Sequence, residues 1–287
     1  MSRTDSENDD QSPRGLAHHG EALFRAGRLP EALVFFDRAL AAAPNYAWAL
    51  AHRADLYREM KRFGEALDDF DRALSLERDY PWARAHRGAV LYHMRRYPAA
   101  LADLDHVIEG APDYVWALAY RPHIYIALKR YEAALADVDA FLALDKSLLP
   151  SWQGERGMIL NYLGRFEESI AGCEDALADD PRDYIAVYTR AVALACGATA
   201  SMAYVPACRD LLVRFEREGL GEPGLVAYRL GALAALEGDV DTAFSRLEQA
   251  ISLHHEPIET ARHDPAWRGC HDAPRYRELI APAEVSF

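Results

Sequence analysis

A twelve-residue phrase recurs every 34 residues, and this repetition constrains the fold more than any other feature. The copies LPEALVFFDRAL, FGEALDDFDRAL, YPAALADLDHVI and YEAALADVDAFL align on Ala32, Ala66, Ala100 and Ala134. The linkers PNYAWAL, RDYPWAR and PDYVWAL recur at the same period. Self-similarity at a fixed period is typical of a solenoid, in which each unit buries its apolar face against the next. The sequence therefore predicts a stack of similar units.

Charge and hydropathy exclude several classes of protein. The net charge of −13 and the lack of a basic stripe make a nucleic-acid partner improbable. No apolar run reaches the roughly 20 residues that span a bilayer, and the start MSRTDSENDDQSP has no signal-peptide core. The four cysteines lack CxxC spacing, which favours thiols in a reducing cytoplasm. Only three of the 32 basic residues are lysine, which, with the abundant alanine, indicates a bacterial protein.

Small residues mark the first helix of each expected hairpin, at Gly20, Ala54, Gly88, Pro122, Gly157, Ala191 and Gly231. A second small residue follows twelve places later in six units, at Ala32, Ala66, Ala100, Ala134, Ser169 and Ala243. Small residues at both places let two antiparallel helices approach closely. Pro122 is the exception, and we expect it to kink or shorten its helix. The sixth unit carries about six extra residues within or between its helices.

This pattern resembles the tetratricopeptide repeat (TPR) family over about residues 15–253. The resemblance implies an all-α, right-handed superhelical solenoid of about seven helix-turn-helix repeats with a C-terminal capping helix. We expect an acidic disordered tail over 1–14 and repeats at about 13–46, 47–80, 81–114, 115–149, 150–183, 184–223 and 224–253. Residues 254–287 form the expected cap, with a short helix over 274–280, and Trp267, Tyr276 and Leu279 cover the last repeat.

An arginine lies one place before the marker residue in five first helices, and three of these arginines meet an aspartate sixteen places later. The pairs are Arg53 with Asp69, Arg87 with Asp103, and Arg121 with Asp137. Because this offset brings side chains together across a helical hairpin, we interpret them as structural ion pairs. Arg156 meets Gly172 at this offset, and it therefore becomes a candidate for ligand binding.

In the family that the chain resembles, the first helices line a concave groove. With Arg156 added, the candidate groove residues are Trp48, His52, Asp55, Trp82, His86, Tyr92, His93, Trp116, Tyr120, His123, Arg156, Tyr162, Tyr188, Tyr228 and Arg229. The tryptophans either anchor a partner or only space the repeats, and both roles stay open. The histidines predict that binding changes between pH 8 and pH 5.5.

The groove residues do not predict a metal or cofactor. His86 and His93 are about 10 Å apart along one helix, and His52 with Asp55 lacks a third ligand. The segment GLGEPG matches a dinucleotide loop formally, but it follows an expected helix instead of a strand. The family's clamp for acidic chaperone C-termini is also missing, because its places carry Ala17, Glu21, His52, Trp82 and His86. We therefore do not expect such a tail as the partner.

The function that these features favour is a scaffold that binds a protein or peptide in an aromatic- and histidine-rich groove. One alternative is a sensor or regulator whose curvature changes when it binds a small molecule or peptide. A second is an accessory or catalytic protein of a biosynthetic pathway, with the His, Asp and Tyr side chains of units two to four as its active site. We expect no enzymatic activity, because an open groove does not exclude water.

Overall fold

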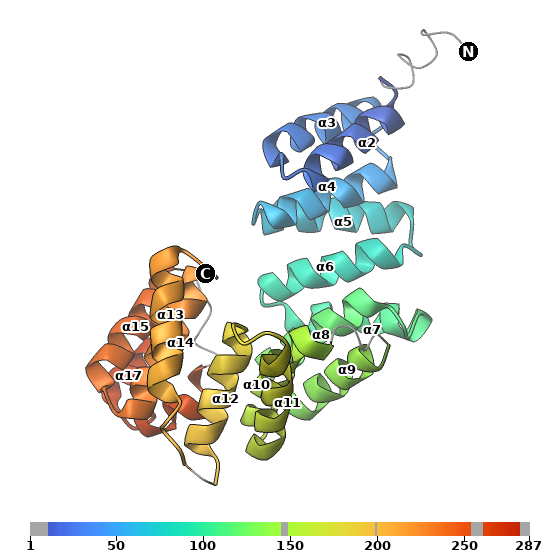
Figure 1. Ribbon diagram of the computed structural model, residues 1–287. Coiled ribbons are helices and arrows are strands. Elements are labelled where there is room, and N and C mark those ends of the chain that lie inside the picture. Colours follow the sequence, from blue (N-terminus) through green and yellow to red (C-terminus); the bar gives the residue numbers. More distant parts are fainter. Residues whose placement is uncertain (1–10, 145–148, 199, 254–260, 282–287) are drawn as a thin grey trace. The chain divides into compact units, whose positions relative to one another are not determined.

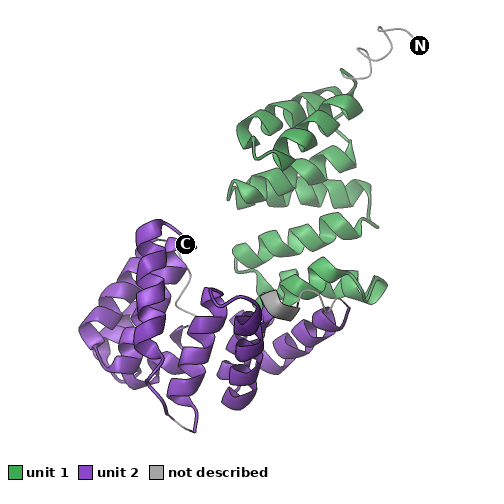
Figure 2. Cartoon of the chain, in the orientation of Figure 1, with its two compact units in different colours: residues 1–124 green, residues 125–287 purple. Residues whose placement is uncertain are grey.

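The computed structural model describes residues 11–144, 149–198, 200–253 and 261–281, and these residues contain helices and no strand (Figure 1). Consecutive helices pack as antiparallel pairs, which makes the chain an all-α solenoid of helical hairpins. The chain forms two compact units, residues 1–124 and 125–287 (Figure 2). Among the described residues, no helix is both long and apolar enough to cross a membrane.

The helices of the first unit alternate between first and second members of a hairpin. The first helices are α2 (Pro13–Arg25), α4 (Ala47–Glu59), α6 (Pro81–His93) and α8 (Val115–Ala127), which ends just beyond the unit. The second helices are α3 (Leu29–Ala42), α5 (Phe63–Leu76) and α7 (Tyr97–Gly110).

The second unit continues the alternation and ends in a cap. Its helices are α9 (Tyr131–Leu144), α10 (Leu149–Tyr162), α11 (Phe166–Asp179), α12 (Tyr184–Cys196), α13 (Val205–Glu218), α14 (Pro223–Glu237) and α15 (Val240–Ser252). The 3-10 helix η2 (Pro265–Cys270) and the short helix α17 (Pro274–Leu279) follow. Most of the expected tail over 1–14 lies outside the described residues, and α2 begins at Pro13.

Apolar side chains at helical spacing hold each hairpin together. In α5 the buried positions Ala66, Phe70, Ala73 and Leu74 form one stripe against α4. At the marker position, a Cβ atom added to Gly20 would lie 3.2 Å from the Ala32 carbonyl oxygen and from the Phe36 ring. The small residue therefore permits the close approach of the two helices.

The helix boundaries test two expectations, one about the length of the helix that contains Pro122 and one about the extra residues of the sixth repeat. The expectation that Pro122 shortens its helix is wrong, because α8 has 13 residues, as do α4 and α6. The missing amide hydrogen removes one backbone hydrogen bond without ending the helix. In the sixth repeat, residues 197–204 separate α12 from α13, so the extra residues lie between the helices.

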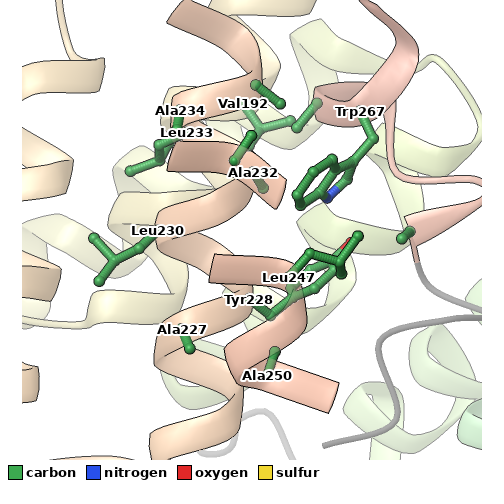
Figure 3. Close-up of a cluster of buried hydrophobic side chains, with 14 of the residues drawn as sticks. Val192, Ala227, Tyr228, Leu230, Ala232, Leu233, Ala234, Leu247, Ala250 and Trp267 are labelled. Carbon is green, nitrogen blue, oxygen red and sulfur yellow. The ribbon is translucent and has the colours of Figure 1, made fainter. Parts of the chain in front are cut away.

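Each unit has its own apolar core. The core of unit 1 runs from Leu16 to Val90, and that of unit 2 runs from Tyr188 to Tyr276. Figure 3 shows Val192, Leu233, Leu247 and Trp267 in the second core. Trp267 of η2 is fully buried, and its ring lies 5.7 Å from that of Tyr276 in α17. The segment after the last repeat therefore covers apolar surface that the repeat would otherwise expose.

Candidate functional site

A row of aromatic rings in stacked or tilted contact follows the first helices of unit 1. It alternates imidazole and indole rings and ends in a tyrosine, and we call it the ring ladder: His18, Trp48, His52, Trp82, His86, Trp116 and Tyr120. Successive ring centroids lie 4.7, 3.9, 4.5, 4.2, 4.4 and 4.8 Å apart. Aromatic contacts of this kind contribute about 0.5–1.5 kcal/mol each beyond area burial.

Contacts within one helix alternate along the ladder with contacts between helices of neighbouring repeats. The ladder therefore joins one repeat to the next. Trp82 stacks on His86 four residues further along α6, and on His52 of α4 in the preceding repeat. Four residues is one turn of helix, so the first contact follows from helical geometry. The Trp82 indole therefore packs between rings of two successive repeats.

The ladder changes the titration of His52. Burial lowers the pKa of His52 to about 4, so this imidazole is neutral throughout the range from pH 8 to pH 5.5. The predicted pH dependence of binding over that range therefore cannot come from His52.

Asp55 of α4 bonds one side chain of its own helix and one side chain of the next repeat. Its Oδ1 atom is 3.0 Å from Nδ1 of His86 and accepts a hydrogen bond from Nε of Arg58 at 2.8 Å. Burial alone would raise the pKa of Asp55, but the His86 hydrogen bond and the Arg58 charge lower it. Asp55 thus bonds the histidine of the next repeat.

Three further rings gather around Tyr120 at the end of the ladder. This tyrosine–histidine cluster consists of Tyr92, His93, Tyr120 and His123. The Tyr120 hydroxyl lies 3.0 Å from Nε2 of His93, and Tyr92 meets Tyr120 edge-on with centroids 5.8 Å apart. His93 and His123 are exposed, so the cluster presents two imidazole side chains to solvent.

The arginine row forms bidentate pairs within the hairpins. Arg53 donates to both carboxylate oxygens of Asp69 at 2.7 and 2.9 Å, and Arg87 donates to both of Asp103 at 2.7 Å. The two aspartates are buried. For Arg121, the described bond is to Asp105 at 2.6 Å.

The same arginines also reach back to the preceding repeat, which the sequence analysis missed. Arg53 binds Asp37 and Arg87 binds Asp71, each at 2.7 Å and sixteen residues earlier. The signal was present, because Asp37, Asp71, Asp105 and Asp139 recur every 34 residues. Each of these arginines therefore joins two second helices.

Arg156 is not the unpaired arginine that the sixteen-residue offset predicted. Its Nε donates to Asp139 at 2.7 Å, seventeen residues earlier, on the preceding second helix. Gly172 offers no carboxylate within the hairpin, and the bond to Asp139 is the counterpart of the bonds that Arg53 and Arg87 make to the preceding repeat. This pairing satisfies part of its hydrogen-bonding capacity, which weakens its case as a ligand residue.

The candidate groove residues of unit 2 are mostly covered. Tyr188, Tyr228 and Arg229 are buried, and Tyr162 stacks on Tyr131 with centroids 5.1 Å apart. The hydroxyls of Tyr188 and Tyr228 donate to Oδ2 of Asp264 at 3.1 and 2.9 Å. The expectation that these tyrosines face a ligand is therefore wrong.

Asp264 escaped the sequence analysis because it lies outside the repeats and no period marks it. Its Oδ1 also accepts the Ala266 backbone amide hydrogen at 2.9 Å, which caps η2. The Arg229 guanidinium lies 5.0 and 5.1 Å from the rings of Tyr184 and Tyr188. Among the residues that the structure describes, no group of three or more His, Cys, Asp or Glu side chains could hold a metal ion.

The repeated helical hairpins and the contacts between them place the chain among the all-α solenoids. The tetratricopeptide repeat family model matches residues 14–79 of the chain. A comparison with curated proteins finds no match.

Solved structures of similar fold cover most of the chain. A tetratricopeptide repeat protein from Parabacteroides merdae aligns with a TM-score of 0.68 and 18% identity, over 89% of this chain and 99% of that one. YrrB, described as a TPR protein with an unusual peptide-binding site, aligns with a TM-score of 0.53 and 19% identity, over 66% and 98%. A thermophilic TPR protein of Thermus thermophilus gives 0.50 and 23%, over 64% and 99%. At these identities the likeness shows the fold.

Proposed function

We propose that the first helices of unit 1 form the binding face of a scaffold for a protein or peptide partner. The observation that carries this proposal is the tyrosine–histidine cluster, in which two exposed histidines lie beside a partly buried tyrosine pair. Aromatic side chains are enriched where proteins bind partners. The peptide-binding site named for YrrB supports the same use of this fold.

The ladder and the cluster have different roles in this proposal. The ladder stacks rings across three repeat boundaries and thereby holds α2, α4, α6 and α8 in register. A preformed face binds with a smaller loss of conformational entropy. The cluster then supplies contacts to the partner through the exposed His93 and His123 side chains, since an imidazole accepts or donates hydrogen bonds.

Catalysis fits the face less well than binding. The Asp55–His86 pair places a carboxylate against an imidazole, as general bases require. His86 is only 8% exposed, however, and its ring lies between the indoles of Trp82 and Trp116. The small exposed fraction of His86, together with the engagement of its Nδ1 atom by Asp55, leaves little of this imidazole for a substrate. We therefore propose a non-catalytic scaffold in the bacterial cytoplasm that the composition favours.

Selection from a random peptide library tests the proposal. Peptides selected on the full chain should bind a His93→Ala variant at least about tenfold more weakly, which is the loss typical of an interface hot spot. His106→Ala is the matched control, because His106 is also exposed but lies on the second helix α7. Equal affinities for both variants, or a loss confined to His106→Ala, would place the binding face elsewhere.

A further inference from the structure

The ring ladder lacks a ring at its N-terminal end. Counting back 34 residues from Trp48 leads to Arg14, so the place that holds tryptophan in repeats two to four holds arginine in repeat one. His52 and His86 each stack on two tryptophans. For His18, the described ring partner is Trp48 alone, at 4.7 Å. One side of the His18 imidazole therefore lacks the indole that its counterparts have.

A hollow of about 790 Å³ lies at this end of the ladder. Its lining includes His18, Tyr46 and Trp48, together with Pro44 from the preceding turn and Arg14. The surface of the lining is mainly apolar. Rings of three kinds and a proline therefore surround a space that is large enough for an indole.

The next repeat shows what such surroundings hold. Moved forward by 34 residues, His18, Tyr46 and Trp48 become His52, Tyr80 and Trp82, and Arg14 becomes Trp48. The Trp48 indole lies 3.9 Å from His52. The hollow is thus the equivalent of a place that an indole occupies one repeat later.

The charged side chain in the lining of the hollow indicates which chemical group a partner carries beside its ring. Arg14 is the one arginine, lysine or carboxylate side chain in the lining, and it is exposed. Its Nε lies 3.4 Å from Nε2 of His18, a single weak hydrogen bond. The terminal nitrogens of a guanidinium bind a carboxylate in a bidentate manner. Residues 1–10, MSRTDSENDD, contain no aromatic residue and cannot supply the ring.

We propose that this hollow binds an aromatic side chain, tryptophan in preference, from a partner segment that carries a carboxylate beside it. The partner's ring extends the ladder by stacking on His18, and the carboxylate pairs with Arg14. This inference rests on the proposed function, because it names the residue type that a bound peptide presents to unit 1.

The test uses two small probes, N-acetyl-L-tryptophan, which has a free carboxylate, and N-acetyl-L-tryptophanamide, which has none. Both are titrated into the full chain while NMR follows the His18 imidazole and the Trp48 indole. We expect saturable ring-current shifts at both residues and tighter binding of the carboxylate probe. Arg14→Trp should abolish binding, because the new indole fills the hollow. Arg14→Ala should bind both probes with equal affinity.

Circular dichroism establishes that both variants fold, so a loss of binding reports on the hollow. The absence of saturable shifts, or unchanged binding to Arg14→Trp, would overturn the proposal. Two other occupants would also overturn it. One is a second copy of the chain, seen as shifts that grow with protein concentration without probe. The other is residues 1–10, seen as binding only after their removal. Peptide selection that depends on His93 would survive any of these results, so the two proposals fail separately.

Discussion

At the residue scale, the ladder tryptophans answer the question that the sequence left open. Each of Trp48, Trp82 and Trp116 contacts one ring of its own helix and one ring of a neighbouring repeat, with Tyr120 in place of histidine beside Trp116. These contacts favour a role of the tryptophans as spacers between repeats, and in the proposed function the neighbouring cluster contacts the partner.

Trp82→Ala should accordingly lower the free energy of unfolding by about 2–4 kcal/mol, because it removes two stacked contacts and leaves a void. Urea unfolding followed by circular dichroism measures this loss. Leu76→Ala serves as the control, since Leu76 is exposed and should cost less than about 0.5 kcal/mol. Similar small losses of unfolding free energy in both variants would show that the Trp82 indole does not stabilise the contact between repeats.

His52 gives the ladder a defined pH dependence. Its pKa in the folded chain is about 4, below the usual value of 6.5, so the neutral form is favoured by folding. The contribution to stability is complete above pH 6.5 and is lost as pH falls toward 4. Urea unfolding between pH 7 and pH 4 should therefore show a smaller decline for His52→Phe than for the native chain. Parallel declines would contradict the burial of this imidazole.

At the element scale, the period predicted the helices and part of their contacts. The small marker residues and the Arg–Asp offset depend on positions within one hairpin, and the geometry of a hairpin is the same in every repeat. Every second ladder contact joins different repeats, as do the Asp37 and Asp71 bonds. A single unit did not predict these contacts, although the residues that form them recur at the 34-residue period. The Asp264 contacts with Tyr188 and Tyr228 have no periodic signal at all.

The two aspartates bound to Arg87 provide a test of the bonds between elements. Asp103 is buried, whereas Asp71 is exposed on the preceding second helix. Asp103→Ala should cost about 2 kcal/mol, because the buried side of the guanidinium loses its acceptor while Asp71 remains. Asp71→Ala should cost less than about 1 kcal/mol. Urea midpoints that fall equally in both variants would show that burial makes no difference to this arginine.

At the scale of the whole molecule, the chain has two units with separate cores, and the described cap completes the second. In a solenoid each repeat depends mainly on its neighbours, so damage to one end should stay local. Trp267 is the largest fully buried side chain of the cap and packs over Gly231 of α14.

Trp267→Ala should destabilise the last repeat by about 3–5 kcal/mol, the range for a large buried aromatic residue. Hydrogen–deuterium exchange should then accelerate in α14 and α15 and remain unchanged in α4 and α6. Arg268→Ala, at an exposed place in the same 3-10 helix, should alter neither region. Faster exchange throughout the chain would contradict the independence of the two units.

The proposed function depends on which helices meet the partner. Hydrogen–deuterium exchange of the full chain, with and without a library-selected peptide, measures this directly. If the peptide binds the first helices of unit 1, exchange in its presence should slow in α4, α6 and α8. Exchange in the second helices α5 and α7 and in all of α10–α15 should be unchanged. Protection of the second helices or of unit 2, without protection of α6 and α8, would contradict it.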